Sequence, residues 1–151
     1  MISKHISDRE GVYSITAIRQ GLDNTPSKTH LNNMKELAEQ IFEPLREWVG
    51  GPIRVNSFYR GEELNKAIGG SSKSQHCKGQ AIDIDDTRCK KTNAEMFKWI
   101  KENLNFDQII WEFGNNKNPD WIHVSYVDEV NNRNRCLKAY KKRSKTKYLV
   151  I

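Results

Sequence analysis

The sequence has no long apolar run and contains few cysteines, prolines and glycines. Its 151 residues include three Cys, four Pro and nine Gly, and hydrophobic residues make up 36% of the chain. No segment approaches the ~20 apolar residues that a membrane-spanning helix requires. The three cysteines are widely spaced and odd in number, which argues against a disulfide framework and favours a reducing compartment. Fourteen aromatic residues still favour a packed domain over a disordered chain.

Positive charge is concentrated near the end of the chain. Eight Lys or Arg residues and no acidic residue lie between Arg133 and Lys147. Such a segment can contact a polyanion such as a cell-wall polymer, a membrane surface or nucleic acid, or it can form an edge strand or strand pair whose lysines prevent aggregation. We favour the strand pair, because only Tyr140 is interleaved with the charges. We therefore expect a single domain over residues 1–151, with a basic C-terminal segment at 131–151.

The periodicity of apolar residues predicts alternating helices and strands. A helical repeat runs from Thr29 to Gly50, with a kink expected at Pro44. A capping box at Thr92–Glu95 predicts the start of a second substantial helix. The remaining predicted elements are a short helix at 62–68, strands at 53–59, 81–85, 106–113 and 121–127, and weaker strands at 136–140 and 148–151. This order favours an α+β fold with a mainly antiparallel sheet over a doubly wound parallel sheet.

Two short segments carry the residues that point to chemistry. The first is Ser-Gln-His-Cys-Lys-Gly-Gln-Ala-Ile-Asp, which contains His76 and Asp83, and the second is Asp-Trp-Ile-His, which ends at His123. Two imidazoles and a carboxylate form a three-ligand zinc site with one position open for water, the arrangement of catalytic rather than structural zinc. Taken singly, Asp83 could instead be a buried residue bonded to the backbone, and His123 a satisfied core histidine.

A carboxylate near the metal is needed to accept a proton from water. Asp120 lies three residues before His123, at the expected entrance of a strand, and we predict it as the base. Glu112 is the competing candidate. Arg60 is expected to close the strand that contains Ser57 and to bind a substrate carboxylate or stabilise an oxyanion, unless it only pairs with Glu62 or Glu63.

The pattern Ser-x-His-x-x-Gly-x-Ala-x-Asp, followed by Asp-x-x-His, resembles the M15 family of zinc peptidases. The family includes D-alanyl-D-alanine carboxypeptidases and phage L-alanyl-D-glutamate endopeptidases of the Hedgehog/DD-peptidase fold. The Ser-x-Tyr-Arg ending at Arg60 is similar to the strand that supplies the family's substrate-contacting arginine. The resemblance covers roughly residues 29–127, and some members have Glu at the position of Asp120.

The resemblance implies a role for each of these residues. His76, Asp83 and His123 would hold Zn²⁺, Asp120 would be the catalytic base, and Arg60 and Ser74 would contact the peptide. The implied function is hydrolysis of an amide bond in the stem peptide of peptidoglycan. Because the first ten residues contain no apolar core, we expect synthesis in the cytoplasm without a signal peptide and access to the wall as in phage lysis or virion-associated enzymes.

Two other functions remain open. The first is a non-catalytic module of the same fold that binds cell wall or a protein partner, although such a module has no need of a base. The second is a nucleic-acid-binding protein that uses the basic segment, for which steep salt dependence would be expected.

Overall fold

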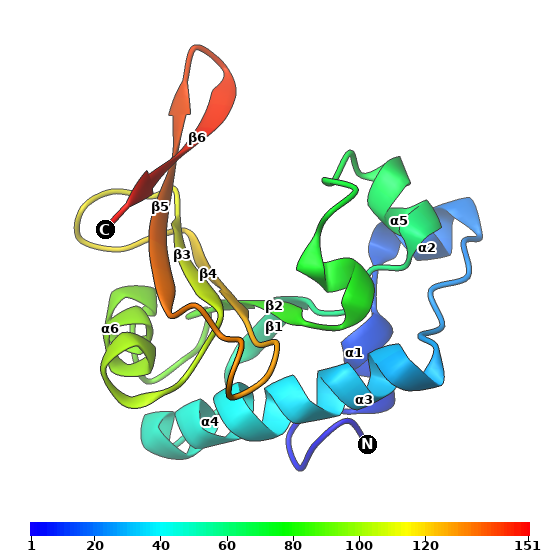
Figure 1. Cartoon of the computed structure of the whole chain (residues 1–151), viewed down its shortest axis with the longest axis horizontal. Helices are drawn as coiled ribbons and strands as arrows, with labels where there is room; N and C mark the ends of the chain where they lie inside the picture. Colours follow the sequence, from blue (N-terminus) through cyan, green and yellow to red (C-terminus); the bar gives the residue numbers. More distant parts are fainter.

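A six-stranded sheet forms the centre of the computed structural model, which describes residues 1–151 (Figure 1). The strand order is β1-β2-β4-β3-β5-β6, and every neighbouring pair is antiparallel except β3 and β5. The strands are β1 (Arg54–Ser57), β2 (Ala81–Asp85), β3 (Gln108–Glu112), β4 (Trp121–Ser125), β5 (Arg135–Lys142) and β6 (Lys145–Val150). The chain therefore has the predicted α+β fold with a mainly antiparallel sheet.

The long helix predicted from Thr29 to Gly50 is present but has three parts. These are α3 (Lys28–Leu37), a π-helical segment η1 (Ala38–Phe42) and α4 (Glu43–Val49). Proline lacks an N–H and its ring collides with the carbonyl four residues earlier. The irregularity expected at Pro44 accordingly takes the form of the wider π turn just before it.

The remaining helical elements are separate from this long helix. They are α1 (Asp8–Val12), α2 (Ile15–Gln20), α5 (Glu62–Ala67), the 3-10 turn η2 (Gln75–Lys78) and α6 (Asn93–Asn103). The capping box predicted for α6 is confirmed, because the Thr92 hydroxyl accepts from the Glu95 N–H while the Glu95 carboxylate accepts from the Thr92 N–H. The Ser7 and Ser14 side chains cap α1 and α2 by accepting hydrogen bonds from the N–H groups of Glu10 and Ala17, respectively. None of the helices combines the length and the hydropathy that a membrane-spanning segment requires.

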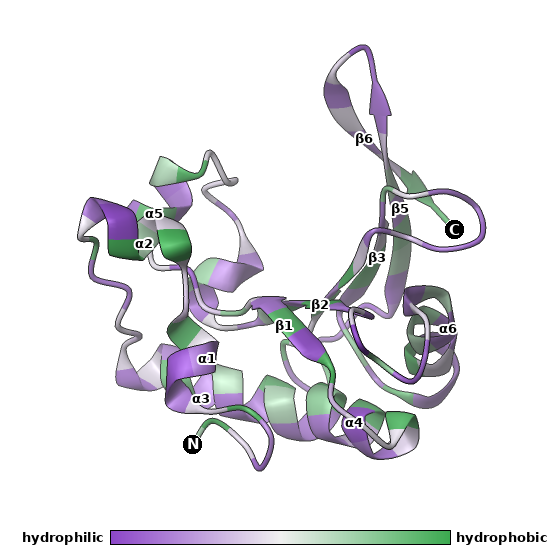
Figure 2. Ribbon diagram, turned by 180° about the vertical axis from the view of Figure 1, so that it is seen from behind, coloured by the Kyte–Doolittle hydropathy of each residue, from purple (hydrophilic) through white to green (hydrophobic).

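The main core lies on one face of the sheet, where α3, η1, α4 and α6 cover it. Alternate residues of the central strands, including Ile82, Ile84, Ile122, Val124 and Ile109, point into this core. Hydrophobic and hydrophilic bands alternate along the helices, as expected for one buried and one solvated face (Figure 2). The opposite face of the sheet carries a smaller buried cluster of Ile110, Leu137 and Ala139.

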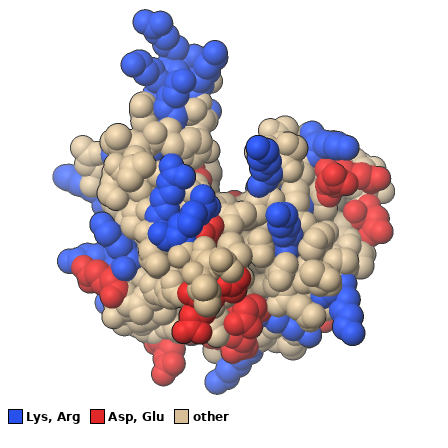
Figure 3. Space-filling view, viewed as in Figure 1, with Lys and Arg blue, Asp and Glu red and all other residues tan.

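The basic C-terminal segment forms the strand pair that we favoured. β5 and β6 make a hairpin whose two turn residues, Arg143 and Ser144, both have positive φ, as the tight turn of a two-residue hairpin requires. The hairpin projects from the body, and its outer end carries a dense group of basic side chains (Figures 1 and 3).

Candidate metal centre and catalytic cleft

The segment before β2 is a tight structural unit that presents His76. The Ser74 hydroxyl accepts a hydrogen bond from the His76 N–H at 3.3 Å and caps η2. Gly79 then ends η2 with a φ of +71°, and a Cβ at this position would lie 2.5 Å from the backbone oxygen of His30. Only glycine satisfies both the left-handed backbone and the close approach to α3. The glycine of the motif is therefore required for the turn that connects His76 in η2 to Asp83 in β2.

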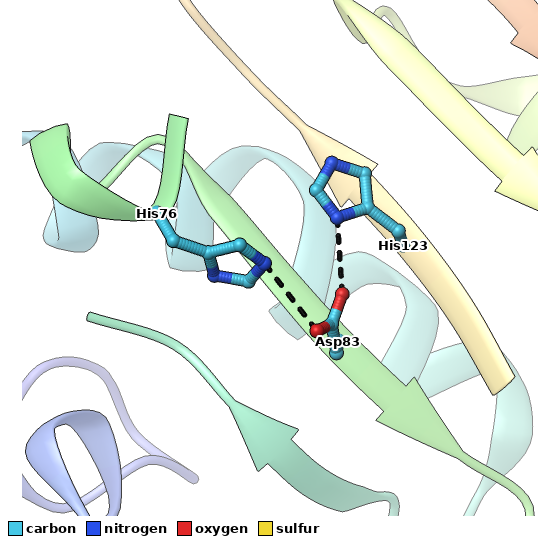
Figure 4. A group of neighbouring side chains, drawn as sticks. All are labelled: His76, Asp83 and His123. Carbon is cyan, nitrogen blue, oxygen red and sulfur yellow. Dashed lines mark hydrogen bonds and ion pairs between the residues drawn. The ribbon is translucent and has the colours of Figure 1, made fainter. Parts of the chain in front are cut away.

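His76, Asp83 and His123 meet on the open face of the sheet, as Figure 4 shows. Asp83 lies directly opposite His123 in the pairing of β2 with β4, so both side chains project from the same face. The His123 Nδ1 is 3.0 Å from one Asp83 oxygen, and the His76 Nε2 is 3.3 Å from the other. The three potential ligand atoms all lie within 4.8 Å of one another.

The hydrogen bonding of His76 fits the role of a metal ligand. Its Nδ1 is 2.7 Å from the Phe58 carbonyl oxygen, which only accepts hydrogen bonds, so Nδ1 carries the proton. Burial lowers the pKa of His76, and the imidazole is therefore neutral at pH 7 with a lone pair on Nε2. That buried Nε2 has no hydrogen-bond partner and faces a carboxylate oxygen. Two electron-rich atoms are brought together where a metal ion would join them.

The electrostatics of Asp83 suit a metal ligand. Burial alone would raise the pKa of this carboxyl group, but the two neighbouring histidines hold it well below its ordinary range. Asp83 is therefore an anion beside two imidazole nitrogens. This donor set fits Zn²⁺, and the Phe58 carbonyl supplies the outer contact that commonly fixes a ligating histidine.

The candidate metal-ligating residues line a cleft of about 890 Å³. One wall comes from the segment between α5 and η2, and the other comes from the β5–β6 hairpin. Figure 3 shows the hollow between these two parts of the molecule. Other lining residues include Arg60, Ser74, Ile110, Glu112, Trp121, Arg135 and Tyr148.

Glu112 lines this cleft together with the three metal-ligating residues. It lies opposite Trp121 in the pairing of β3 with β4, on the same face as His123 two residues along. Its side chain is mostly buried and forms no ion pair or hydrogen bond with the protein. Burial raises the pKa of Glu112 to about 7, with the His123 charge opposing the shift and the Asp83 charge adding to it. A group with these properties can exchange a proton near neutral pH.

Asp120, predicted as the base, is placed elsewhere by the structure. It is exposed and lines a separate hollow with Phe113, Lys138 and Lys141. The reason is the strand period of two, since residues three apart in an extended chain project from opposite faces. His123 faces the cleft, and Asp120 does not line it. Of the two carboxylates considered from sequence, the structure therefore brings Glu112, and not Asp120, into the cleft with His123.

Arg60 and Ser74 both line the cleft, as expected. β1 ends at Ser57, so Arg60 belongs to the connection after the strand rather than to its last position. Its backbone N–H donates to the His76 carbonyl at 3.2 Å. Arg60 forms no ion pair with Glu62 or Glu63, and its buried Nε has no hydrogen-bond partner within the protein. The Arg60 guanidinium is consequently available to a ligand.

A polar network that sequence reasoning missed holds the η2 turn in place. The carboxylate of Asp107, only 2% exposed, accepts from the Gln75 amide at 2.9 Å and from the Arg133 guanidinium at 2.9 and 2.8 Å. Burial alone would raise the pKa of Asp107, but the Arg133 contacts lower it. Gln75 immediately precedes His76, so this network links the metal-binding turn to β3 and to the start of β5. No local sequence pattern indicates contacts between such distant residues.

The comparison with known families agrees with this site. A model of the family Peptidase M15 matches residues 4–125. The chain belongs to the Peptidase M15 family. Its members are peptidases and are generally zinc-dependent, which fits the His/Asp/His group. A search of curated proteins finds no significant match.

The Peptidase M15 match ends at Ser125, the last residue of β4. Strands β1 to β4, which carry Asp83, Glu112 and His123, lie inside the matched part of the chain. The β5–β6 hairpin lies outside it, although the hairpin contributes one wall of the cleft.

Proposed function

We propose that this protein is a zinc-dependent peptidase that hydrolyses an amide bond in the stem peptide of peptidoglycan. The observation that carries the proposal is the unpartnered Nε2 of His76, buried and aimed at Asp83 beside His123. His76 Nε2, an Asp83 oxygen and His123 Nδ1 would hold the metal. When bound, Zn²⁺ supplies Lewis acidity, which polarises the scissile carbonyl and makes water a stronger acid.

Glu112 would act as the general base in this reaction. Its carboxylate lines the cleft near the metal ligands and has no competing hydrogen bond. Glu112 would take a proton from the attacking water and deliver it to the nitrogen of the departing amine. The burial that raises its pKa to about 7 makes both transfers feasible near neutral pH.

Arg60 would position the substrate. Its guanidinium has no acidic partner and presents paired donors, which match the two oxygens of a carboxylate. A stem peptide carries free carboxylates close to its amide bonds, so this contact would fix the register of the peptide against the metal. Ser74 caps η2 and contributes to the same wall of the cleft.

The bond that is cut determines the biological setting. An L-alanyl-D-glutamate endopeptidase separates stem peptides from the glycan strands and dissolves the wall, as a phage-type lysis or virion-associated enzyme requires. A D-alanyl-D-alanine carboxypeptidase removes one terminal residue and leaves the network intact. We propose the lysis role on the basis of the motif resemblance to phage endopeptidases.

The test is mass spectrometry of purified peptidoglycan after incubation with the protein, with and without a chelator. Chelator-sensitive release of peptides is expected, and the fragment masses identify the bond. Soluble stem peptides indicate endopeptidase action, whereas loss of one alanine indicates a carboxypeptidase. Intact wall after incubation with protein that carries zinc would reject the peptidase and favour a non-catalytic binding module.

A further inference from the structure

The hairpin beyond the family-matched region contributes a second group of side chains to the lining of the cleft. Arg135, Leu137, Thr146 and Tyr148 all come from β5 or β6 and line the same cavity as His76 and Asp83. They lie on one face because Leu137 pairs with Ile110, and Ala139 pairs with both Glu112 and Tyr148. The cleft is therefore a continuous surface that crosses from β2 to β6.

The charges on this surface are unbalanced. The cleft is lined by four basic residues, Arg60, Lys73, Arg133 and Arg135, and by two acidic residues, Asp83 and Glu112. Arg133 forms an ion pair with Asp107, and the two oxygens of Asp83 each face a histidine nitrogen. Arg135 is exposed and forms no ion pair, although many acidic residues are present elsewhere on the chain. An unpaired guanidinium in a binding cleft favours an anionic ligand.

Tyr148 adds a hydrogen-bond donor to the same wall of the cleft, opposite Ala139 and therefore roughly 13 Å along β5 from Arg135. Burial raises the pKa of the Tyr148 phenol, and the charge of Glu112 raises it further, so the hydroxyl remains protonated. Thr146 supplies a second hydroxyl two residues away on the same face. The small apolar cluster of Ile110, Leu137 and Ala139 forms the floor between these groups and the metal centre.

We propose that Arg135 forms a second anion-binding subsite, which holds a carboxylate of the substrate several residues from the scissile amide, and that Tyr148 donates a hydrogen bond to the substrate further along the same wall. This inference rests on the proposed peptidase function. β4 and β5 are two strand spacings apart, so His123 and β5 are separated by about 10 Å, which an extended peptide covers in about three residues. The substrate class is accordingly a peptide with at least two carboxylates, one for Arg60 and one for Arg135.

The experiment uses the zinc-loaded full chain and a synthetic stem peptide in which each free carboxylate is replaced in turn by a carboxamide. For the wild-type protein, one replacement remote from the scissile bond is expected to lower kcat/KM about tenfold, the scale of one charge-assisted contact. Arg135→Gln should cause a similar loss with the unmodified peptide and should be insensitive to that replacement. Tyr148→Phe should give a smaller loss in the same direction.

Lys142→Gln is the matched control, because it removes one exposed positive charge from the same strand outside the cleft. It should behave as wild type at moderate salt. Calorimetric titration of the unmodified peptide into zinc-loaded Glu112→Gln, with and without Arg135→Gln, gives a readout that does not depend on turnover. A weaker Kd only with the Arg135 change supports the subsite.

Equal effects of Arg135→Gln and Lys142→Gln would overturn the subsite, as would an Arg135→Gln protein that still discriminates the carboxamide peptide. In both cases wild-type cleavage persists and the proposed function stands. Absence of cleavage by the zinc-loaded wild type would instead reject the proposed function itself.

Discussion

Glu112 and His123 project from the same face of the sheet on the neighbouring strands β3 and β4, and both line the cleft. This relationship places a carboxylate with a pKa of about 7 beside a metal ligand. Asp120 is close to His123 in sequence but lines a different hollow. Substitution of Glu112 and substitution of Asp120 should therefore have different effects on kcat.

Glu112→Gln should lower kcat by about 10²- to 10⁴-fold, the usual contribution of a general base, while zinc content stays unchanged. Asp120→Asn should retain near wild-type kcat, because Asp120 does not line the cleft. Turnover of a stem peptide and zinc analysis by mass spectrometry of both variants provide the comparison. A strong loss in Asp120→Asn with full activity in Glu112→Gln would restore the sequence-based choice.

Glu112 should also make the metal-free protein less stable as pH rises. Its folded pKa is about 7 against an ordinary value of 4.5, so the folded state holds a proton that the unfolded state releases. Stability contributed by the protonated group is therefore lost between pH 4.5 and pH 7. Relative to wild type, chelator-treated Glu112→Gln should gain stability from pH 5 to pH 8, by up to about 3 kcal/mol.

Urea unfolding at several pH values measures this difference, with the exposed Glu63→Gln as the control. The control should show no comparable dependence on pH. A constant free-energy difference between wild type and Glu112→Gln across the range would mean that Glu112 is not buried as the structure describes.

His76→Ala should abolish metal binding. The variant removes the buried Nε2, which has no hydrogen-bond partner within the protein, together with the Nδ1 hydrogen bond to the Phe58 carbonyl. Zinc at a hundredfold excess over Kd stabilises a protein by about 2.7 kcal/mol, and this gain should disappear in the variant. His5→Ala, far from the site and paired with Glu43, is the control. Unchanged zinc content in His76→Ala would refute the proposed ligand set.

Gly79→Ala and Gly69→Ala separate backbone strain from crowding. Both residues have positive φ, but a Cβ at Gly69 meets nothing, whereas one at Gly79 would lie 2.5 Å from the His30 oxygen. Gly69→Ala should cost about 1 kcal/mol of unfolding free energy from the left-handed conformation alone. Gly79→Ala should cost several times more and reduce zinc affinity, because η2 carries His76. Equal costs in denaturant titrations would show that α3 does not constrain the turn.

Asp107→Asn should destabilise the protein and disturb the cleft. The buried carboxylate accepts from Gln75 and from the backbone and side chain of Arg133, and loss of its charge should cost about 2–3 kcal/mol. Its pKa is lowered in the folded state, so this contribution is present at neutral pH and is lost as pH falls through the acidic range. Chemical denaturation at pH 7 that gives equal stabilities would contradict the network.

Local signals in the sequence were sufficient for most elements of the fold. The capping box at Thr92 and the helical repeat before Gly50 predicted α6 and the α3–α4 helix, and alternation predicted β2 and β4. The helices α1 and α2 were not predicted, because each is only one or two turns long and shows little periodicity. The predicted strand ends were also inexact, because β1, β3 and β4 are shorter than predicted whereas β5 and β6 are longer.

The metal-ligating group could be predicted because its residues lie in two compact motifs. The position of Glu112 could not be settled in the same way, because its proximity to His123 depends on the register of β3 with β4. The contribution of Arg135 and Tyr148 to the cleft was even harder to predict from sequence. It depends on the parallel pairing of β3 with β5 and on a hairpin beyond the matched region. Long-range strand pairing leaves no mark on the local pattern of residues.

The most direct test of the central claim is a zinc titration of chelator-treated protein, followed by the release of fragments from purified peptidoglycan. We predict that activity rises in proportion to added zinc and reaches a plateau at one ion per chain, and that Glu112→Gln binds the same ion without releasing fragments. Fragment release from metal-free protein, or a zinc-saturated wild type that leaves the wall intact, would contradict the account.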